Sequence, residues 1–137
     1  MRWGSEMADE PVVVDASAII DLVIGATPAA AIGRRIDGRT LYAPAHVDAE
    51  VLSALGRLYR AGQLPAREVT RRLDIARDMP IQRFPLRDLV MGAWRRRKQL
   101  RLADALYVEL AVRLGLRLVT TDAALGRASH VAEVIGP

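Results

Sequence analysis

The 137-residue chain contains no cysteine, and aromatic residues make up only 4% of it. Without cysteine, neither a disulfide framework nor a thiolate metal site can form. Any bound metal must therefore be held by oxygen ligands or by one of the two histidines, which favours hard cations such as Mg²⁺ or Mn²⁺. With so few aromatic side chains, the core must be built from Ala, Val, Leu and Ile.

Long apolar runs are also missing. No segment approaches the roughly 18–20 apolar residues that a membrane-spanning helix needs, and residues 1–10 lack the apolar centre of a signal peptide. We therefore expect a soluble, cytoplasmic protein with no membrane partner. Met1–Glu6 is either an expression remnant or an extended natural start, so we expect a flexible extension over 1–10 and one domain over 11–137.

Lysine is almost absent, because Lys98 is the only lysine among 20 basic residues, and the net charge is +4. Arginine binds phosphate and carboxylate groups through paired hydrogen bonds, so this bias suits a nucleic acid or an acidic protein partner. The densest basic run is Arg95, Arg96, Arg97 and Lys98, and we predict that it contacts a nucleic-acid backbone. The alternative is a solvated helix end whose cations complement the helix dipole.

Hydrophobic residues make up 51% of the chain, enough for a folded core, and they follow two alternating patterns. Short apolar runs predict strands over 12–14, 41–43, 81–84, 116–120 and 131–135. Apolar residues at three- and four-residue steps predict helices over 16–24, 29–36, most of 44–62, 65–79, 86–94, 102–114 and about 123–127. This alternation indicates an α/β fold in which helices cover both faces of a parallel sheet.

Two acidic residues follow the strongest predicted strands. Asp15 comes directly after Val12–Val14, and Asp122 comes just after Leu118–Thr120. In an open parallel sheet, ligands bind beyond the carboxyl ends of the strands, so both acids are predicted to face one crevice. Each acid taken alone is more often the N-cap of the helix that follows.

Two further acids lie along apolar helix faces. Asp104 precedes Val108 by four residues, and Glu50 follows Val47 by three. Because burying an unpaired carboxylate is costly, each should be protonated, paired with one of the many arginines, or bound to a metal. Four gathered carboxylates repel one another unless a cation neutralises them. An oxygen-only cluster suits Mg²⁺ or Mn²⁺, ions that usually serve phosphate chemistry.

Four segments around these acids resemble, in the same order, the acidic motifs of the PIN-domain family. They are spread along nearly all of the chain from Val12 onward, and they are Val13–Leu22, Pro44–Leu55, Leu102–Ala111 and Leu118–Asp122. The size and single-domain layout look most like the VapC-type toxin ribonucleases of type II toxin–antitoxin systems. The resemblance implies a three-layer α/β/α sandwich with a central, mainly parallel sheet over 11–137.

The resemblance also implies a Mg²⁺- or Mn²⁺-dependent endoribonuclease. The metal-binding and catalytic acids would be Asp15, Glu50, Asp104 and Asp122. Thr120 matches the family's hydroxyl position, and Ser17 would play a similar supporting part near the first acid. Family members typically form homodimers, and a VapB-type antitoxin holds them inactive by inserting a segment into the acidic site. The implied partners are therefore RNA, an antitoxin and a second copy of the chain.

One position departs from the family pattern. Ser53 stands where many relatives carry asparagine three residues after the second acid, and its hydroxyl replaces only part of that amide's hydrogen bonding. His46 and His130 match no catalytic position, so we expect them to be structural. Asp21 and Asp48 lie close to the motifs and are either supporting residues or simply solvated.

The predicted mechanism is attack of a metal-activated water on an RNA phosphodiester, for which no histidine or lysine base is required. Arginines would neutralise the RNA backbone. Two other Mg²⁺-dependent folds do not fit. A phosphoacceptor receiver domain needs a lysine beyond its final strand, and a haloacid-dehalogenase-type phosphatase needs an aspartate where Ser17 stands. A PIN-like module that binds RNA or protein without cleaving RNA stays open as the alternative.

Overall fold

A computed structural model describes residues 10–136 of the chain. The extension predicted for 1–10 lies outside the described residues except for Glu10. The domain predicted for 11–137 can therefore be compared with the structure almost in full.

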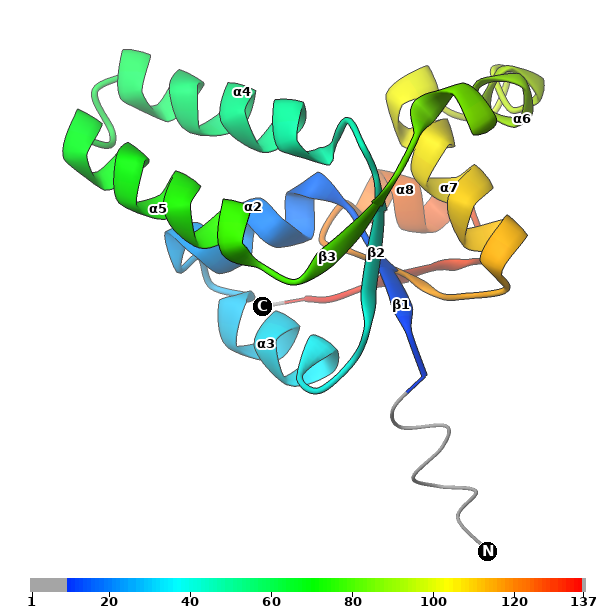
Figure 1. The fold of residues 1–137 in the computed structure, drawn as a ribbon, viewed down its shortest axis with the longest axis horizontal. Coiled ribbons are helices and arrows are strands. Elements are labelled where there is room, and N and C mark those ends of the chain that lie inside the picture. Colours follow the sequence, from blue (N-terminus) through cyan, green and yellow to red (C-terminus); the bar gives the residue numbers. More distant parts are fainter. Residues whose placement is uncertain (1–9, 137) are drawn as a thin grey trace, which may run out of the picture.

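The centre of the fold is a parallel sheet, and five strands belong to it among residues 10–136 (Figure 1). The strands are β1 (Val12–Val14), β2 (Leu41–Pro44), β3 (Ile81–Phe84), β4 (Leu118–Thr120) and β5 (Ala132–Val134). All four neighbouring pairs are parallel, which confirms the predicted sheet. β4 and β5 are each shorter than the runs predicted from the sequence.

The order of the strands, β3-β2-β1-β4-β5, creates the crevice that the sequence analysis expected. The chain builds the sheet outward on one side of β1 and then crosses to the other side. Such a reversal opens a ligand crevice beyond the carboxyl ends of the two central strands. Val14 pairs with Val119 across β1 and β4, so Asp15 and Thr120 follow side by side at this edge.

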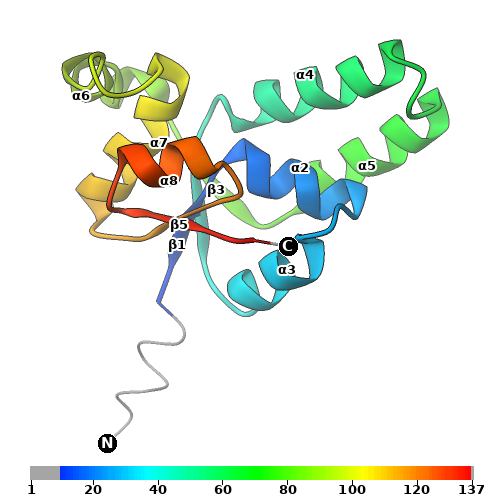
Figure 2. The same cartoon turned by 180° about the vertical axis from the view of Figure 1, so that it is seen from behind.

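Helices flank the sheet on both sides (Figures 1 and 2). On one side α7 packs against β1, β2 and β4 and carries α6, while on the other side α2 contacts α3, α4 and α5. The described helices are α2 (Ala16–Ile24), α3 (Ala29–Ile36), α4 (Val47–Arg60), α5 (Ala66–Asp78), α6 (Val90–Arg95), α7 (Leu102–Leu114) and α8 (Ala123–Ala128). This arrangement confirms the predicted three-layer α/β/α sandwich. In this part of the chain, no single helix is long and apolar enough to cross a membrane; α2 and α3 pass such a test only as a pair bent by 118°.

Two glycines end helices where the sequence predicted stops. Gly25 after α2 and Gly115 after α7 have φ values of 69° and 68°, in the left-handed region that glycine enters without a steric penalty. After Gly25 the chain turns into α3, and after Gly115 it returns to the sheet. Since α7 ends here, β4 can begin only three residues later and run beside β1.

The helix predicted over 86–94 is broken in the structure. A 3₁₀ turn, η1 (Leu86–Asp88), precedes α6, and the amide of Leu89 donates to the carbonyl of Leu86. This tighter turn brings Leu89 into the core, where it is 2% exposed. The predicted apolar stripe is therefore wrong for Val90 and Trp94, which are 47% and 52% exposed.

The apolar residues at three- and four-residue steps in α4 also do not all face the core. Val47, Val51 and Leu55 are buried, but Tyr59 is exposed. The last turn of α4 extends beyond the sheet, as Figure 1 shows, and only α5 lies beside it there. With no third layer to cover it, the final aromatic residue of the stripe meets solvent.

Candidate active site

Asp15, at the carboxyl end of β1, is the most buried acid of the candidate site, with 5% of its surface exposed. Its Oδ1 accepts hydrogen bonds from the Ser17 hydroxyl at 2.7 Å and the Ala18 amide at 3.0 Å. Its Oδ2 accepts one from the Thr120 hydroxyl at 2.6 Å. Asp15 is thus the N-cap of α2, the alternative role, and it also joins β1 to β4. Both predicted supporting hydroxyls contact this acid.

The carboxyl group of Asp15 is difficult to ionise. Burial raises its pKa to about 6, although the hydrogen bonds from Thr120, Ser17 and Ala18 act in the opposite direction. The charge of Asp104 raises the pKa further, so the two acids are close enough to repel each other. A cation bound between them would favour the ionised form of both.

Glu50, in the first turn of α4, is held by an aromatic residue of α7. The hydroxyl of Tyr107 donates to Glu50 Oε1 at 2.6 Å, and His46 Nε2 lies 3.4 Å from the same oxygen. Burial first, and then Glu50, raise the pKa of Tyr107, so its hydroxyl keeps its proton and remains a donor. His46 packs against the Tyr107 ring at 4.7 Å, and its Nε2 lies 3.0 Å from the Ala103 carbonyl oxygen. His46 therefore contacts the Tyr107 ring and the Glu50 carboxylate, and its structural role stays a prediction.

Asp104, in the first turn of α7, is paired with Arg101. The Arg101 Nε lies 3.1 Å from Asp104 Oδ2, and the Asp104 side chain is 18% exposed. The hydrogen bond and charge of Asp104 raise the pKa of Arg101, and the charges of Asp122 and Glu50 add to the effect. The arginine pair named as the alternative for Asp104 is therefore present. One guanidinium lies within electrostatic reach of three of the four predicted acids.

Asp122 follows β4 and caps α8. Its Oδ1 accepts from the amides of Ala124 and Leu125 at 2.9 and 3.3 Å. Its own amide donates to the Thr120 hydroxyl at 3.0 Å, which connects it to Asp15 through one residue. The N-cap alternative is thus realised for Asp122 as well. One of its oxygens does the capping, and the second accepts no hydrogen bond from the described residues.

The donor chemistry of this region fits a hard cation. Within residues 10–136, no three histidine or acidic side chains are already grouped closely enough to bind a metal. Yet all four predicted ligands are carboxylates, which Mg²⁺ and Mn²⁺ prefer. Asp15 and Asp104 repel each other, and Arg101 supplies positive charge to the acids other than Asp15. The residues that would hold an ion here are Asp15, Glu50, Asp104 and Asp122.

Two of the four acids, Asp104 and Asp122, line an open cavity of about 380 Å³. Asp104, Asp122 and Arg101 form its polar wall. The remaining lining residues are Gln99, Leu100, Ala124, Leu125 and Ala128, which lie before α7 and along α8. A polymer can therefore approach the acids along the gap between these two helices.

The two acids next to the motifs have different surroundings. Asp21 accepts a hydrogen bond from the Thr121 hydroxyl at 2.7 Å, so it supports the segment that leads to Asp122. Asp48 instead accepts two hydrogen bonds from Arg83 on β3, both of 2.8 Å. Although it lies two residues before Glu50, Asp48 has an ion-pair partner of its own away from the acids.

The basic run is divided by the structure. Arg96 pairs with Glu109 at 3.2 Å, and the Arg97 guanidinium lies 4.7 Å from the centre of the Trp94 ring. Arg95 and Lys98 are exposed. His130 and Ser53 are exposed as well, and neither contacts the four acids.

Sequence analysis missed Tyr107 and Arg101, which each hold one of the predicted acids. The position of both residues close to Asp104 could have been predicted from their spacing in the sequence. Arg101 precedes Asp104 by three residues, and Tyr107 follows it by three. On a helix, residues three apart share a face. What the spacing does not reveal is that the Tyr107 hydroxyl crosses to Glu50 on α4.

Replacing Tyr107 with phenylalanine tests this link. The ring and its packing remain, but Glu50 loses a charge-assisted hydrogen bond of the kind that contributes about 1.5–3 kcal/mol. The ribonuclease activity predicted from the sequence should then fall by about tenfold, which corresponds to about 1.4 kcal/mol. Tyr59→Phe, at an exposed tyrosine of α4, should have no effect. The measurement is the initial cleavage rate of both variants at equal folded fractions. Equal rates for Tyr107→Phe and Tyr59→Phe would show that the Tyr107 hydroxyl does not contribute to the activity.

Comparison with known proteins shows which family and which relatives the chain resembles. A family model described as the PIN domain matches residues 12–131. Ribonuclease VapC3 of Mycobacterium tuberculosis is 49% identical over 137 residues, 99% of this chain and 100% of that protein. Ribonuclease VapC12 of the same organism is 34% identical over 124 residues, 90% of this chain and 96% of that protein.

Two solved structures have the same fold. The crystal structure of PAE2754 from Pyrobaculum aerophilum has a TM-score of 0.68 and 23% sequence identity, and the match covers 98% of this chain and 90% of that one. A toxin–antitoxin complex from Klebsiella pneumoniae has a TM-score of 0.62 and 15% identity, and the match covers 91% of this chain and 98% of that one. At these identities the two likenesses concern the fold alone.

Proposed function

The chain belongs to the PIN domain family, and from this premise we propose that it is an endoribonuclease of the VapC type, the toxin of a toxin–antitoxin pair. The full-length similarity to two proteins named as VapC ribonucleases supports the activity. The observation that supports placing this activity at the four acids concerns Asp15. Asp15 is a buried acid at the point where the strand order reverses, and Asp104 repels its carboxyl group. The toxin acts where its RNA is, in the cytoplasm.

The four acids would hold Mg²⁺ or Mn²⁺, which when bound would supply an activated water and a positive charge beside the phosphate. Three of the acids are each oriented by a partner in the protein: Asp15 by Ser17 and Thr120, Glu50 by Tyr107, Asp104 by Arg101. Orienting partners of this kind tune metal affinity and activity in metal sites generally. Arg101, 78% exposed at the rim, is able to turn from Asp104 toward a phosphate. The exposed cations Arg95 and Lys98 add nonspecific attraction for the RNA backbone.

The partners follow from the toxin role. An antitoxin covers the acids, and the toxin–antitoxin complex from Klebsiella pneumoniae, whose fold resembles this one, supports such a pairing. The chain forms a homodimer, and an exposed apolar surface of α6 and α7 beside Asp104 is available for contact with another chain. Its side chains are Val90, Met91, Trp94 and Leu102.

The experiment that tests the function is cleavage of total RNA by purified, antitoxin-free protein with Mg²⁺ or Mn²⁺ and with EDTA. Asp104→Asn should lower the rate about a hundredfold, because a carboxylate that binds the metal loses its charge. Asp48→Asn is the matched control: it removes an acid of α4 that pairs with Arg83, and its rate should stay within about twofold of the unaltered protein, as for most surface changes.

The opposite results also have a clear meaning. Cleavage that continues in EDTA and in folded Asp104→Asn protein would refute a carboxylate-held metal. Metal binding without any cleavage, seen as a rise in melting temperature on adding Mn²⁺ that Asp104→Asn abolishes, would favour a catalytically silent module.

A further inference from the structure

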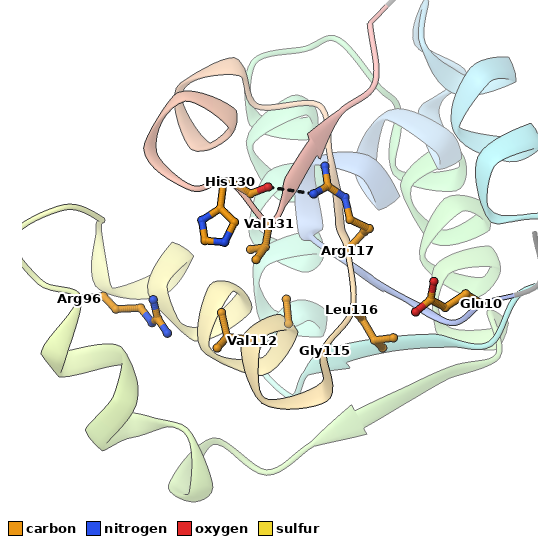
Figure 3. A pocket seen from close by; sticks show the side chains of 9 residues that line it. Glu10, Arg96, Val112, Gly115, Leu116, Arg117, His130 and Val131 are labelled. Carbon is orange, nitrogen blue, oxygen red and sulfur yellow. Dashed lines mark hydrogen bonds between the residues drawn. The ribbon is translucent and has the colours of Figure 1, made fainter. Parts of the chain in front are cut away.

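The cavity beside the acids continues along α7 into two more cavities. A middle cavity of about 170 Å³ has three lining residues in common with it: Gln99, Leu100 and Ala128. The middle cavity in turn shares three with the cavity of about 510 Å³ drawn in Figure 3: Arg96, Val112 and His130. Because neighbouring cavities have walls in common, they form one groove between α7 and the segment 128–131, here named the α7 groove.

The α7 groove leads away from the acids toward the opposite end of the sheet. It begins at Asp104, in the first turn of α7, and reaches Gly115, just past the end of that helix. At about 1.5 Å per helical residue the groove is about 16 Å long. At about 3.4 Å per nucleotide of a stacked strand, that length accommodates about five nucleotides.

Arg96 and Arg117 line the far cavity, and each shares an acid with a second arginine that lies outside the cavity lining. Glu109 is shared by the guanidinium groups of Arg96 and Arg113, at 3.2 and 2.7 Å. Two guanidiniums on one carboxylate leave a net positive charge. Burial opposes ionisation of Glu109, but the hydrogen bonds from Arg113 and Arg96 outweigh it and lower the pKa of Glu109. The carboxylate therefore stays ionised and the arginines stay in place.

A second arrangement of the same kind holds Arg117, which lines the far cavity, while Arg35 and Glu133 lie outside the lining. Arg35 and Arg117 share Glu133, at 2.6 and 3.8 Å, which again leaves one cation in excess. Arg117 also donates to the carbonyl of His130 at 2.9 Å, and Figure 3 shows both side chains bordering the same cavity. Glu10 is the one acid on this wall among the described residues. Val112, Leu116 and Val131 supply apolar surface against which bases can pack.

We propose that the α7 groove binds the RNA strand that leads away from the cleaved bond, and that Arg117 and His130 are positioning residues for its phosphates. The inference rests on the proposed ribonuclease function. A groove with carboxylates at one end and cations at the other suits one RNA strand, since the metal site takes the cleaved phosphate and the cations take phosphates farther along.

The test measures binding of fluorescein-labelled RNA of mixed sequence to the full chain in EDTA, so that no cleavage occurs. Arg117→Glu should weaken binding of a ten-nucleotide RNA by about tenfold. It should also reduce the slope of log affinity against log salt, by about 0.7 for each phosphate that the protein no longer neutralises. Arg117→Lys should keep most of the affinity. Arg60→Glu, an equal change of charge at the exposed end of α4, is the control and should have less than a third of the effect.

The length of the RNA separates positioning from general attraction. A three-nucleotide RNA at the acids should bind the Arg117→Glu protein and the unaltered protein equally. Equal losses for Arg117→Glu and Arg60→Glu, or an unchanged salt slope, would overturn the groove. So would loss of antitoxin binding with RNA binding intact, which would assign the surface to a protein. Cleavage by unaltered protein, measured separately, shows whether the groove or the nuclease function has failed.

Discussion

Asp15→Asn is expected to lower the rate of RNA cleavage by about a thousandfold while the protein stays folded. The variant keeps the shape of the side chain but removes its negative charge. Loss of a metal-holding carboxylate at the reaction centre removes several kcal/mol of stabilisation, and about 4 kcal/mol corresponds to a thousandfold. The measurement is the single-turnover rate on a fixed RNA with saturating Mg²⁺.

The same substitution should stabilise the metal-free fold near neutral pH. Burial raises the pKa of Asp15 from 3.8 to about 6. Between these values the folded state binds more protons than the unfolded state, so the free energy of unfolding falls as the pH rises through this window. Ionisation of Asp15 therefore destabilises the fold above about pH 6, by up to about 3 kcal/mol at 1.36 kcal/mol per pKa unit. Asparagine does not ionise.

Urea unfolding in EDTA checks this expectation. The difference in unfolding free energy between Asp15→Asn and the unaltered protein should be near zero at pH 4 and favour the variant by up to about 3 kcal/mol at pH 7.5. Other titrating groups cancel in the difference. An equal difference in unfolding free energy at both pH values would mean that ionisation of the Asp15 carboxyl group does not destabilise the fold. An active Asp15→Asn enzyme would remove Asp15 from the catalytic group.

Gly92→Ala should destabilise the fold by about 3 kcal/mol, the largest effect expected outside the active site. A Cβ at Gly92 in α6 would overlap the carboxyl group of Glu109 on α7. Glu109 is 8% exposed, and its carboxyl group is held from two sides by Arg96 and Arg113. Either the carboxylate leaves both arginines, or α6 moves away from α7.

A second glycine provides the control. Gly33 lies inside α3, and a Cβ there meets nothing within 4 Å. Gly33→Ala should therefore stabilise the fold by about 0.5–1 kcal/mol, the usual gain inside a helix. If the Gly92 effect is the overlap itself, Glu109→Ala should restore part of the loss, so the two changes should couple by at least about 1 kcal/mol in a double-mutant cycle. Additive effects would mean that the overlap with Glu109 does not cause the loss of unfolding free energy in Gly92→Ala.

Much of the fold follows from local patterns in the sequence. Val12–Val14 and Leu118–Thr120 are β-branched or apolar runs too short for helices, and the helices between strands have clear three- and four-residue spacing. The alternation then requires parallel strands with crossover helices. The break at Leu89 was not predictable, because a 3₁₀ turn and a helix have nearly the same apolar spacing over a few residues.

The candidate site was predictable only in part. Asp15 and Asp122 follow strands, so the parallel sheet alone brings them to one edge. The partners of the acids depend on contacts between distant elements. Tyr107 reaches Glu50 across 57 residues of chain, and Glu109 beneath Gly92 joins α6 to α7. From helical spacing alone, Tyr107 would be predicted as a core residue and Glu109 as a surface residue. Spacing does not predict which distant residue either side chain contacts.

The reversal of strand order at β1 also has a consequence for synthesis of the protein. Asp15 and the Thr120 hydroxyl that holds it are 105 residues apart in the chain. At about 5–20 residues per second, roughly 5–20 s pass between their emergence during translation. Until β4 takes its place beside β1, the nascent chain has half of the crevice and neither Thr120 nor Asp122. A ribosome making this ribonuclease is therefore not exposed to a completed active site until the segment through Asp122 has been made.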